Sequence, residues 1–228
     1  MRRSLRLATV ATLSAGLVGL GAGTAAAQDV EVAEPATFTS MFTAMATPDM
    51  VVNNDGVATP GEAGATGTFH YRINSETEVI CYDITLDGVT PPYQSPARTA
   101  THIHEGDAGR AGPPRIAFPN PEDAGDGTLR SEGCLQGPFT TGIMANGSDT
   151  GTGFTLARIE ADPASFFTDT HTSTFTAGAV RGQLTEVPMG GVETGAGGTT
   201  GTEPALAALA IGTTVAAGGY ALRRRARS

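Results

Sequence analysis

The stretch FHYRINSETEVICYDITL, from Phe69 to Leu86, alternates apolar and polar residues on both sides of a polar turn. Apolar side chains recur at every second position, which is the period of a β-strand with one buried face. The NSET between the two runs is a short polar segment of the kind that joins antiparallel strands. The stretch therefore predicts a β-hairpin and indicates an all-β chain.

Further strand candidates lie outside this hairpin, separated by clusters of Gly, Pro, Asn and Asp. They cover residues 37–45, 98–104, 115–118, 128–135 and 176–184. Residues 49–67 are expected to form a loop, and a short helix is expected near residues 154–161 because Pro163 would end it. We therefore predict a single all-β domain, an antiparallel β-sandwich or Greek-key barrel, followed by a flexible C-terminal tether.

Both ends of the chain have the composition of targeting segments. Residues 1–27 combine three arginines, an apolar run and small residues before Gln28, which is typical of a signal peptide. Residues 205–228 form an apolar stretch followed by four arginines, as in a transmembrane anchor or a cell-wall sorting segment. We expect a domain over residues 28–189, a Gly- and Thr-rich tether over 190–204, and export to the cell surface.

The part of the chain between these ends is strongly acidic. All 23 acidic residues lie between Asp29 and Glu203, whereas 7 of the 14 basic residues lie in the two targeting segments. Such a surface repels phosphate backbones, so we expect no nucleic-acid partner. The absence of lysine and the abundance of Ala, Gly and Thr favour a GC-rich, actinobacterial source.

The chain has two cysteines, Cys81 and Cys134. An even number of cysteines in an exported chain favours a disulfide. A metal-thiolate site or a catalytic thiol is the alternative, but neither cysteine belongs to a CxxC motif or has a histidine beside it in the sequence. We predict that the two residues form a structural bridge.

A second motif, ATHIHEGDAGRAGP from Ala100 to Pro113, has the clearest potential for chemistry. On an extended strand His102 and His104 share one face, about 6.5 Å apart at the backbone, which is close enough to share a ligand. Three glycines at three-residue intervals then predict a tight loop before the proline. These glycines are Gly106, Gly109 and Gly112.

This motif resembles the A-x-HIH-x-G-x-x-G-x-x-GP signature of the CHRD domain, a family named from chordin. The resemblance continues in the downstream segments FTDTHT and TAGAVRGQL, which contain His171, Arg181, Gly182 and Gln183. Among several departures, Asp169 stands where the family has Asn. The resemblance implies a noncatalytic extracellular module whose partner is an unidentified extracellular protein or cell-wall component.

His102, His104 and His171 form one possible metal site, because three imidazoles suit zinc or copper. In that alternative the chain is a metal-binding redox protein with the architecture of copper-zinc superoxide dismutase. In the other interpretation the histidines and Arg181 hydrogen-bond to backbone and carboxylates within the fold. No serine lies in a GxSxG motif, so we expect no enzyme activity and no cofactor apart from such a metal.

Overall fold

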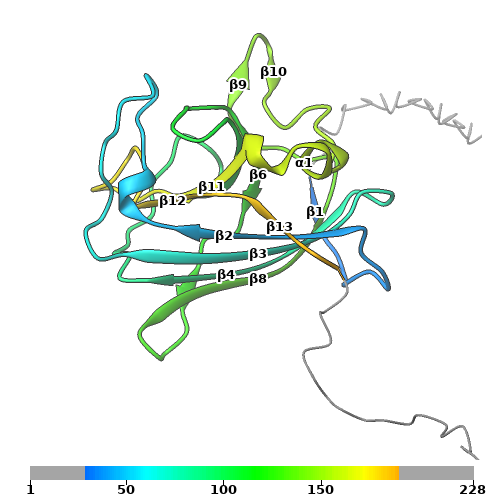
Figure 1. Ribbon diagram of the computed structural model, residues 1–228, viewed down its shortest axis with the longest axis horizontal. Helices are drawn as coiled ribbons and strands as arrows, with labels where there is room; N and C mark the ends of the chain where they lie inside the picture. The colour runs from blue at the N-terminus through cyan, green and yellow to red at the C-terminus, as the bar shows by residue number, and fades with distance from the viewer. Residues whose placement is uncertain (1–28, 190–228) are drawn as a thin grey trace, which may run out of the picture. The chain divides into compact units, whose positions relative to one another are not determined.

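The computed structural model describes residues 29–189, which form two packed antiparallel β-sheets (Figure 1). In spatial order the larger sheet contains β1 (Val30–Glu31), β8 (Thr128–Gln136), β4 (Val79–Asp87), β3 (Thr66–Asn74), β2 (Ser40–Ala46) and β13 (Thr185–Val187). The short strand β7 (Glu122–Asp123) also pairs with β8. The predicted all-β sandwich is confirmed.

The smaller sheet is the one that positions the candidate site. Its strand order is β12 (Val180–Gln183), β11 (Phe166–Thr170), β5 (Thr101–Glu105) and β6 (Pro114–Phe118). The remaining elements are the hairpin of β9 (Met144–Ala145) and β10 (Ser148–Asp149), the helix α1 (Ala157–Ala161), and the 3-10 helices η1 (Pro48–Met50) and η2 (Pro163–Ser165). The chain passes from the smaller sheet to the larger one at the buried Leu184.

The predicted hairpin is confirmed by β3 and β4, which pair from Thr66 opposite Asp87 to Asn74 opposite Val79. Alternate side chains of this hairpin are fully buried between the sheets. They pack against apolar side chains of the smaller sheet, such as Ile103. Each large apolar side chain buried in this way contributes about 1.5–3 kcal/mol to folding.

A polar contact also crosses the sandwich. The Tyr71 hydroxyl and the Thr168 Oγ1 lie 2.8 Å apart, and both side chains are completely buried. Burial raises the pKa of the Tyr71 phenol, because the charged form would lose its hydration. The hydrogen bond satisfies both hydroxyls and fixes β11 against β3.

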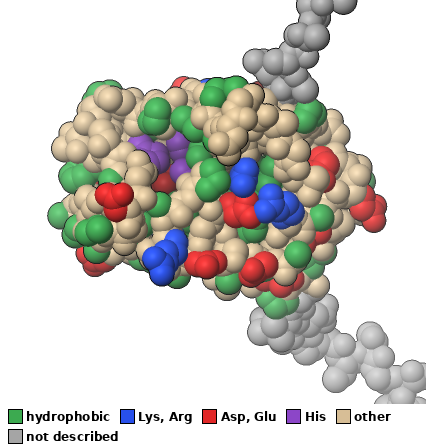
Figure 2. Space-filling view, turned by 90° about the horizontal axis from the view of Figure 1, so that it is seen from above, with side chains coloured by type: hydrophobic (Ala, Val, Ile, Leu, Met, Phe, Trp, Pro, Cys, Tyr) green, Lys and Arg blue, Asp and Glu red, His purple; other side chains and the backbone are tan. Residues whose placement is uncertain are grey.

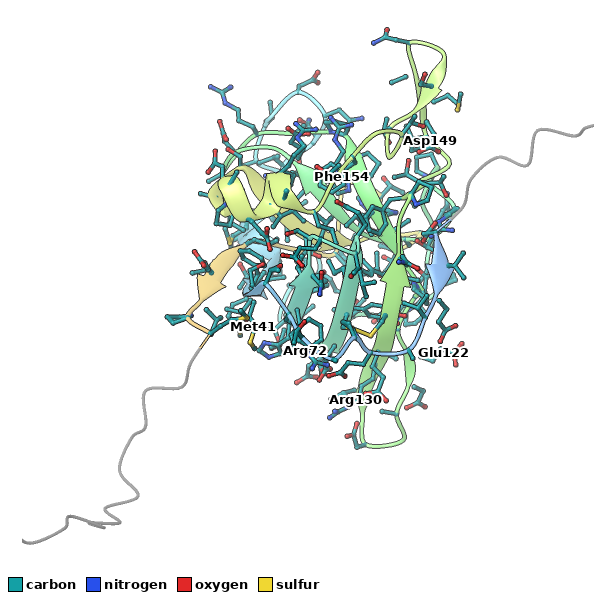
Figure 3. The ribbon with its side chains drawn as sticks, turned by 90° about the vertical axis from the view of Figure 1, so that its right-hand side faces the viewer. Met41, Arg72, Glu122, Arg130, Asp149 and Phe154 are labelled. Atoms are coloured by element: carbon teal, nitrogen blue, oxygen red, sulfur yellow. A yellow bond between two sulfur atoms is a disulfide. The ribbon has the colours of Figure 1, made fainter. Side chains whose placement is uncertain are left out.

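The predicted disulfide between Cys81 and Cys134 is confirmed (Figure 3). The two residues are direct partners on β4 and β8, and 53 positions separate them in the sequence. They belong to a small apolar cluster with Val79, Val32 and Phe38, distinct from the main core. Closing a loop of this length stabilises the fold by about 4 kcal/mol in the chain-entropy model.

Several predicted boundaries were wrong, and one strand was missed. The strand expected over residues 176–184 begins only at Val180, because Gly178 turns the chain at a φ of 136°. The strand expected from Arg98 begins at Thr101. Strand β11, which was not predicted, is buried at all five positions and therefore shows no alternation in its sequence.

Several predictions concern residues outside the described range. The signal peptide, the tether over residues 190–204 and the C-terminal segment over residues 205–228 all lie there. Within residues 29–189, no helix has the length and apolar character needed to cross a bilayer.

Candidate metal centre

Four side chains with metal-binding donor atoms meet on adjacent strands of the smaller sheet. His102 and His104 lie on β5, Asp169 lies opposite His102 on β11, and His171 follows the last residue of β11 by one position. One donor atom from each side chain lies within 4.8 Å of the other three. Because Ile103 points into the core, its two neighbours point to the opposite face of the sheet.

The carboxylate of Asp169 is the centre of this cluster. Its Oδ1 lies 3.5 Å from Nδ1 of His102 and 3.2 Å from Nε2 of His104, and its Oδ2 lies 3.3 Å from Nε2 of His171. The side chain of His102 is 1% exposed, whereas those of His104 and His171 are 12% and 13% exposed. The cluster is thus buried on one side and reachable from the other, and Figure 2 shows histidine side chains gathered on the molecular surface.

The second ring nitrogen of each histidine faces a backbone carbonyl. The three nitrogen-to-oxygen distances are 2.7, 2.8 and 3.0 Å, and a carbonyl can only accept, so these nitrogens carry the protons. The accepting carbonyls belong to Thr99, Gly112 and Thr176. In the neutral rings, the nitrogens that face Asp169 are therefore unprotonated.

Three nitrogen lone pairs and a carboxylate repel one another when nothing positive lies between them. Nδ1 of His102, Nε2 of His104 and Oδ1 of Asp169 are buried and have no hydrogen-bond partner. Buried polar atoms are rarely left unpaired, because doing so costs about 1–3 kcal/mol each. The arrangement calls for protons or a cation at the centre.

The pKa values of the cluster residues shift because these groups are buried close to one another. Burial lowers the pKa of His102, because its charged form would lose hydration. Burial alone would raise the pKa of Asp169 and lower that of His171. The attraction of Asp169 to His104 and His171 outweighs burial, so the pKa of Asp169 lies well below its usual range, and its attraction for His171 raises the pKa of that ring.

Arg181 and Gln183, from the downstream motif, hold the glycine loop in place. The Arg181 guanidinium lies 3.4 Å from the ring centre of Phe167, and its Nη2 donates to the carbonyls of Asp107 and Arg110. The Gln183 amide donates to the Gly106 carbonyl at 2.8 Å. Both motif residues therefore stabilise the loop that supplies the carbonyl accepting from His104.

Gly112 is required at that carbonyl for steric reasons. A Cβ on this residue would lie 1.7 Å from the carbonyl oxygen of Glu105, which is far inside van der Waals contact. Gly109 has a different requirement, since its φ is 71° and a Cβ there would meet nothing within 4 Å. The first glycine is needed for close approach and the second for backbone conformation.

The structure brings together the three histidines singled out in the sequence and places Arg181 beside them. Gly182 packs against the backbone of Met45, and Pro113 accepts from the Glu105 amide, so both serve the fold around the site. Sequence reasoning missed Asp169 as a donor. Asp169 and His171 stand two residues apart, as His102 and His104 do, and this repeated spacing is the signal that could have revealed it.

The family model for the CHRD domain matches residues 42–184 of this chain. The match includes both cysteines, all four cluster residues and the Arg181 motif. Comparisons with curated proteins and with solved structures found no match. The glycine-loop motif, the Arg181 motif that holds this loop, and the family match agree, and the chain belongs to the CHRD domain family.

Proposed function

We propose that this chain is a noncatalytic extracellular binding module with a divalent metal ion, zinc by preference, held by His102, His104, His171 and Asp169. Neutral imidazole nitrogens and a carboxylate oxygen are donors that zinc commonly takes in proteins. The proposal extends the family assignment, which by itself implies only a noncatalytic extracellular domain.

The observation that carries the proposal is the convergence of three imidazole nitrogens on Asp169, with the other nitrogen of each ring bound to a backbone carbonyl. Metal-binding histidines typically donate their second N–H in this way. The contacts of His102 and His104 to Oδ1 of Asp169 and of His171 to Oδ2, at 3.2–3.5 Å, are close to the donor-donor separation of about 3.3 Å expected for zinc bonds of about 2.0–2.1 Å, and all four donors lie within 4.8 Å of one another.

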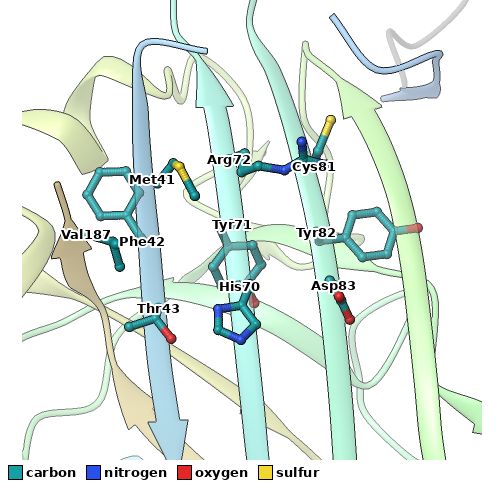
Figure 4. A pocket seen from close by; sticks show the side chains of 10 residues that line it. All are labelled: Met41, Phe42, Thr43, His70, Tyr71, Arg72, Cys81, Tyr82, Asp83 and Val187. Carbon is teal, nitrogen blue, oxygen red and sulfur yellow. The ribbon is translucent and has the colours of Figure 1, made fainter. Parts of the chain in front are cut away.

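A noncatalytic role is favoured over the redox alternative. A centre of the copper-zinc superoxide dismutase type would need a second cluster of ligands beside the first. Residues 29–189 contain no other group of three or more His, Cys, Asp or Glu donors at metal-binding distances. His70, the fourth histidine of the chain, lies on the outer face of the larger sheet (Figure 4).

The extracellular location is supported by the disulfide, which is typical of oxidising compartments, and by the composition of residues 1–27 and 205–228. We place the domain outside the membrane, attached to membrane or cell wall by the C-terminal segment. Its partner would be an extracellular protein or a cell-wall component.

Zinc titration of the exported, metal-free chain by calorimetry tests the proposal. We expect equimolar binding in the wild type and a large loss of affinity in His102→Ala and His171→Ala. His70→Ala is the matched control, because it removes a histidine outside the cluster and should bind zinc like the wild type. Equal zinc binding by all four proteins, or none by the wild type, would contradict the proposal.

A further inference from the structure

We propose that the metal-loaded centre binds a small carboxylate ligand, which reaches the metal through a pocket lined by the three histidines. The inference rests on the proposed metal function and adds to it the chemical class of the ligand. Three features of the site support it: a pocket over the imidazoles, a local excess of positive charge, and walls suited to a carbon skeleton.

The pocket has a volume of about 330 Å³ and has His102, His104 and His171 among its lining residues. A recess of about 40 Å³ reaches Asp169 from the side of Arg181, with room for about one or two waters. Both hollows share the two more exposed histidines, so they border the same two side chains of the cluster. The larger volume is at the lower end of the range for small-molecule sites, which favours a small ligand.

The charge of the metal-loaded site favours an anion. A divalent ion held by three neutral imidazoles and one carboxylate keeps one net positive charge, and the Arg181 guanidinium in the recess adds a second. Asp169 is the only acidic residue lining either hollow, although the chain has 23 acidic residues. The metal-loaded site would therefore have a positive electrostatic potential within an otherwise acidic domain.

A carboxylate fits this site better than a phosphate does. Pro96, Pro113 and Ile143 line the pocket and can contact the carbon part of an organic acid. Asn54, which lines both hollows, offers an amide donor, and Ser95 and Thr176 add only single hydroxyls to the larger pocket. One carboxylate oxygen can coordinate zinc as a fifth ligand, because zinc sites sometimes expand from four to five coordination.

Visible absorption of the cobalt(II)-loaded chain gives the test, since cobalt(II) reports a change of coordination that zinc cannot. At saturating cobalt and constant ionic strength, titration with acetate should give a saturable loss and shift of the cobalt bands. Perchlorate, which coordinates weakly, should give none. A second titration, with a capped glutamate pentapeptide, distinguishes a partner's side chain from a free acid. If acetate and the peptide both change the cobalt bands, the pocket admits a carboxylate side chain. If acetate alone changes them, the ligand is a free acid.

A matched pair of variants locates the binding. Asn54→Asp places a negative charge at the pocket rim and should weaken acetate binding by about tenfold, as expected for a like charge nearby. Thr85→Asp adds the same charge on β4, opposite Arg130 of β8 on the larger sheet, and should bind acetate as the wild type does.

The possible results separate this inference from the metal function. Cobalt bands that do not respond to acetate would overturn the carboxylate site and leave the metal centre standing. A chain that binds no cobalt would overturn both. An equal loss of acetate affinity in Asn54→Asp and Thr85→Asp would show a general charge effect and overturn the assignment to this pocket.

Discussion

Asp169 lies where three imidazole nitrogens meet, so its substitution separates two accounts of the cluster. If the histidines are charged and paired with this carboxylate, the cluster is a buried ion network, and breaking such a network costs about 3–5 kcal/mol. If the histidines are neutral metal ligands, the metal-free protein holds an unrelieved repulsion at this point. The two accounts predict opposite changes in the stability of the metal-free chain.

We predict that Asp169→Asn leaves the free energy of unfolding of the metal-free chain unchanged or raised at pH 9.5, about three units above the ordinary histidine pKa, a margin chosen because the pKa of His171 is raised. An asparagine amide can donate to an imidazole lone pair, whereas the carboxylate cannot. Zinc affinity should fall by at least about tenfold. Urea unfolding and zinc titration measure the two effects, and a loss of several kcal/mol in the metal-free variant would favour the ion network.

At the scale of elements, the site depends on a loop that joins β5 to β6 and is held from β12. Its carbonyl at Gly112 orients His104, and Arg181 fixes its other turn through two carbonyls. The two family motifs, far apart in sequence, therefore act on a single loop. This explains why the histidine motif is followed by glycines and why an arginine appears in the last strand of the smaller sheet.

Two alanine substitutions in this loop should differ sharply. Gly112→Ala would force a Cβ into the Glu105 carbonyl, so the loop must shift and His104 must lose its acceptor. We expect a marked loss of both stability and zinc affinity. Gly109→Ala meets no atom and should cost only about 1–2 kcal/mol of backbone strain, with zinc affinity retained. Similar zinc affinities in the two variants would disprove the role of the loop.

The elements that the sequence predicted are those with one buried face. Strands β3 and β4 were predicted because alternation exposes His70 while burying Tyr71. Strand β11 was not, because both of its faces are covered and its residues FFTDT are mixed in polarity. Asp169 lies on that strand, so the element and its donor were missed together.

For the whole molecule, the disulfide and the proposed metal centre would be independent sources of stability. Cys81 and Cys134 join two strands of the larger sheet, whereas the metal donors belong to the smaller one. Replacing both cysteines with serine should lower the free energy of unfolding by about 4 kcal/mol and leave zinc affinity as it was. Denaturant unfolding measures the first effect. A loss of less than about 1 kcal/mol would show that the bridge contributes little.

The attachment of the domain is a prediction from the sequence of the C-terminal segment. Removing residues 205–228 should release the domain into the medium with its fold intact, since the last strand within residues 29–189 ends at Val187. Immunoblots of medium and cell envelope, together with a thermal melt of the released protein, measure both parts. A full-length chain that is already mostly in the medium would contradict a role for this segment in attachment.

Anomalous diffraction at the zinc absorption edge, from crystals of the zinc-loaded chain, tests directly whether zinc binds among these four side chains. We predict a single strong peak among the four donors, at about 2.0–2.2 Å from Nδ1 of His102, Nε2 of His104, Nε2 of His171 and a carboxylate oxygen of Asp169. A peak at His70 or on the acidic surface, with none between these four side chains, would contradict the proposed zinc centre.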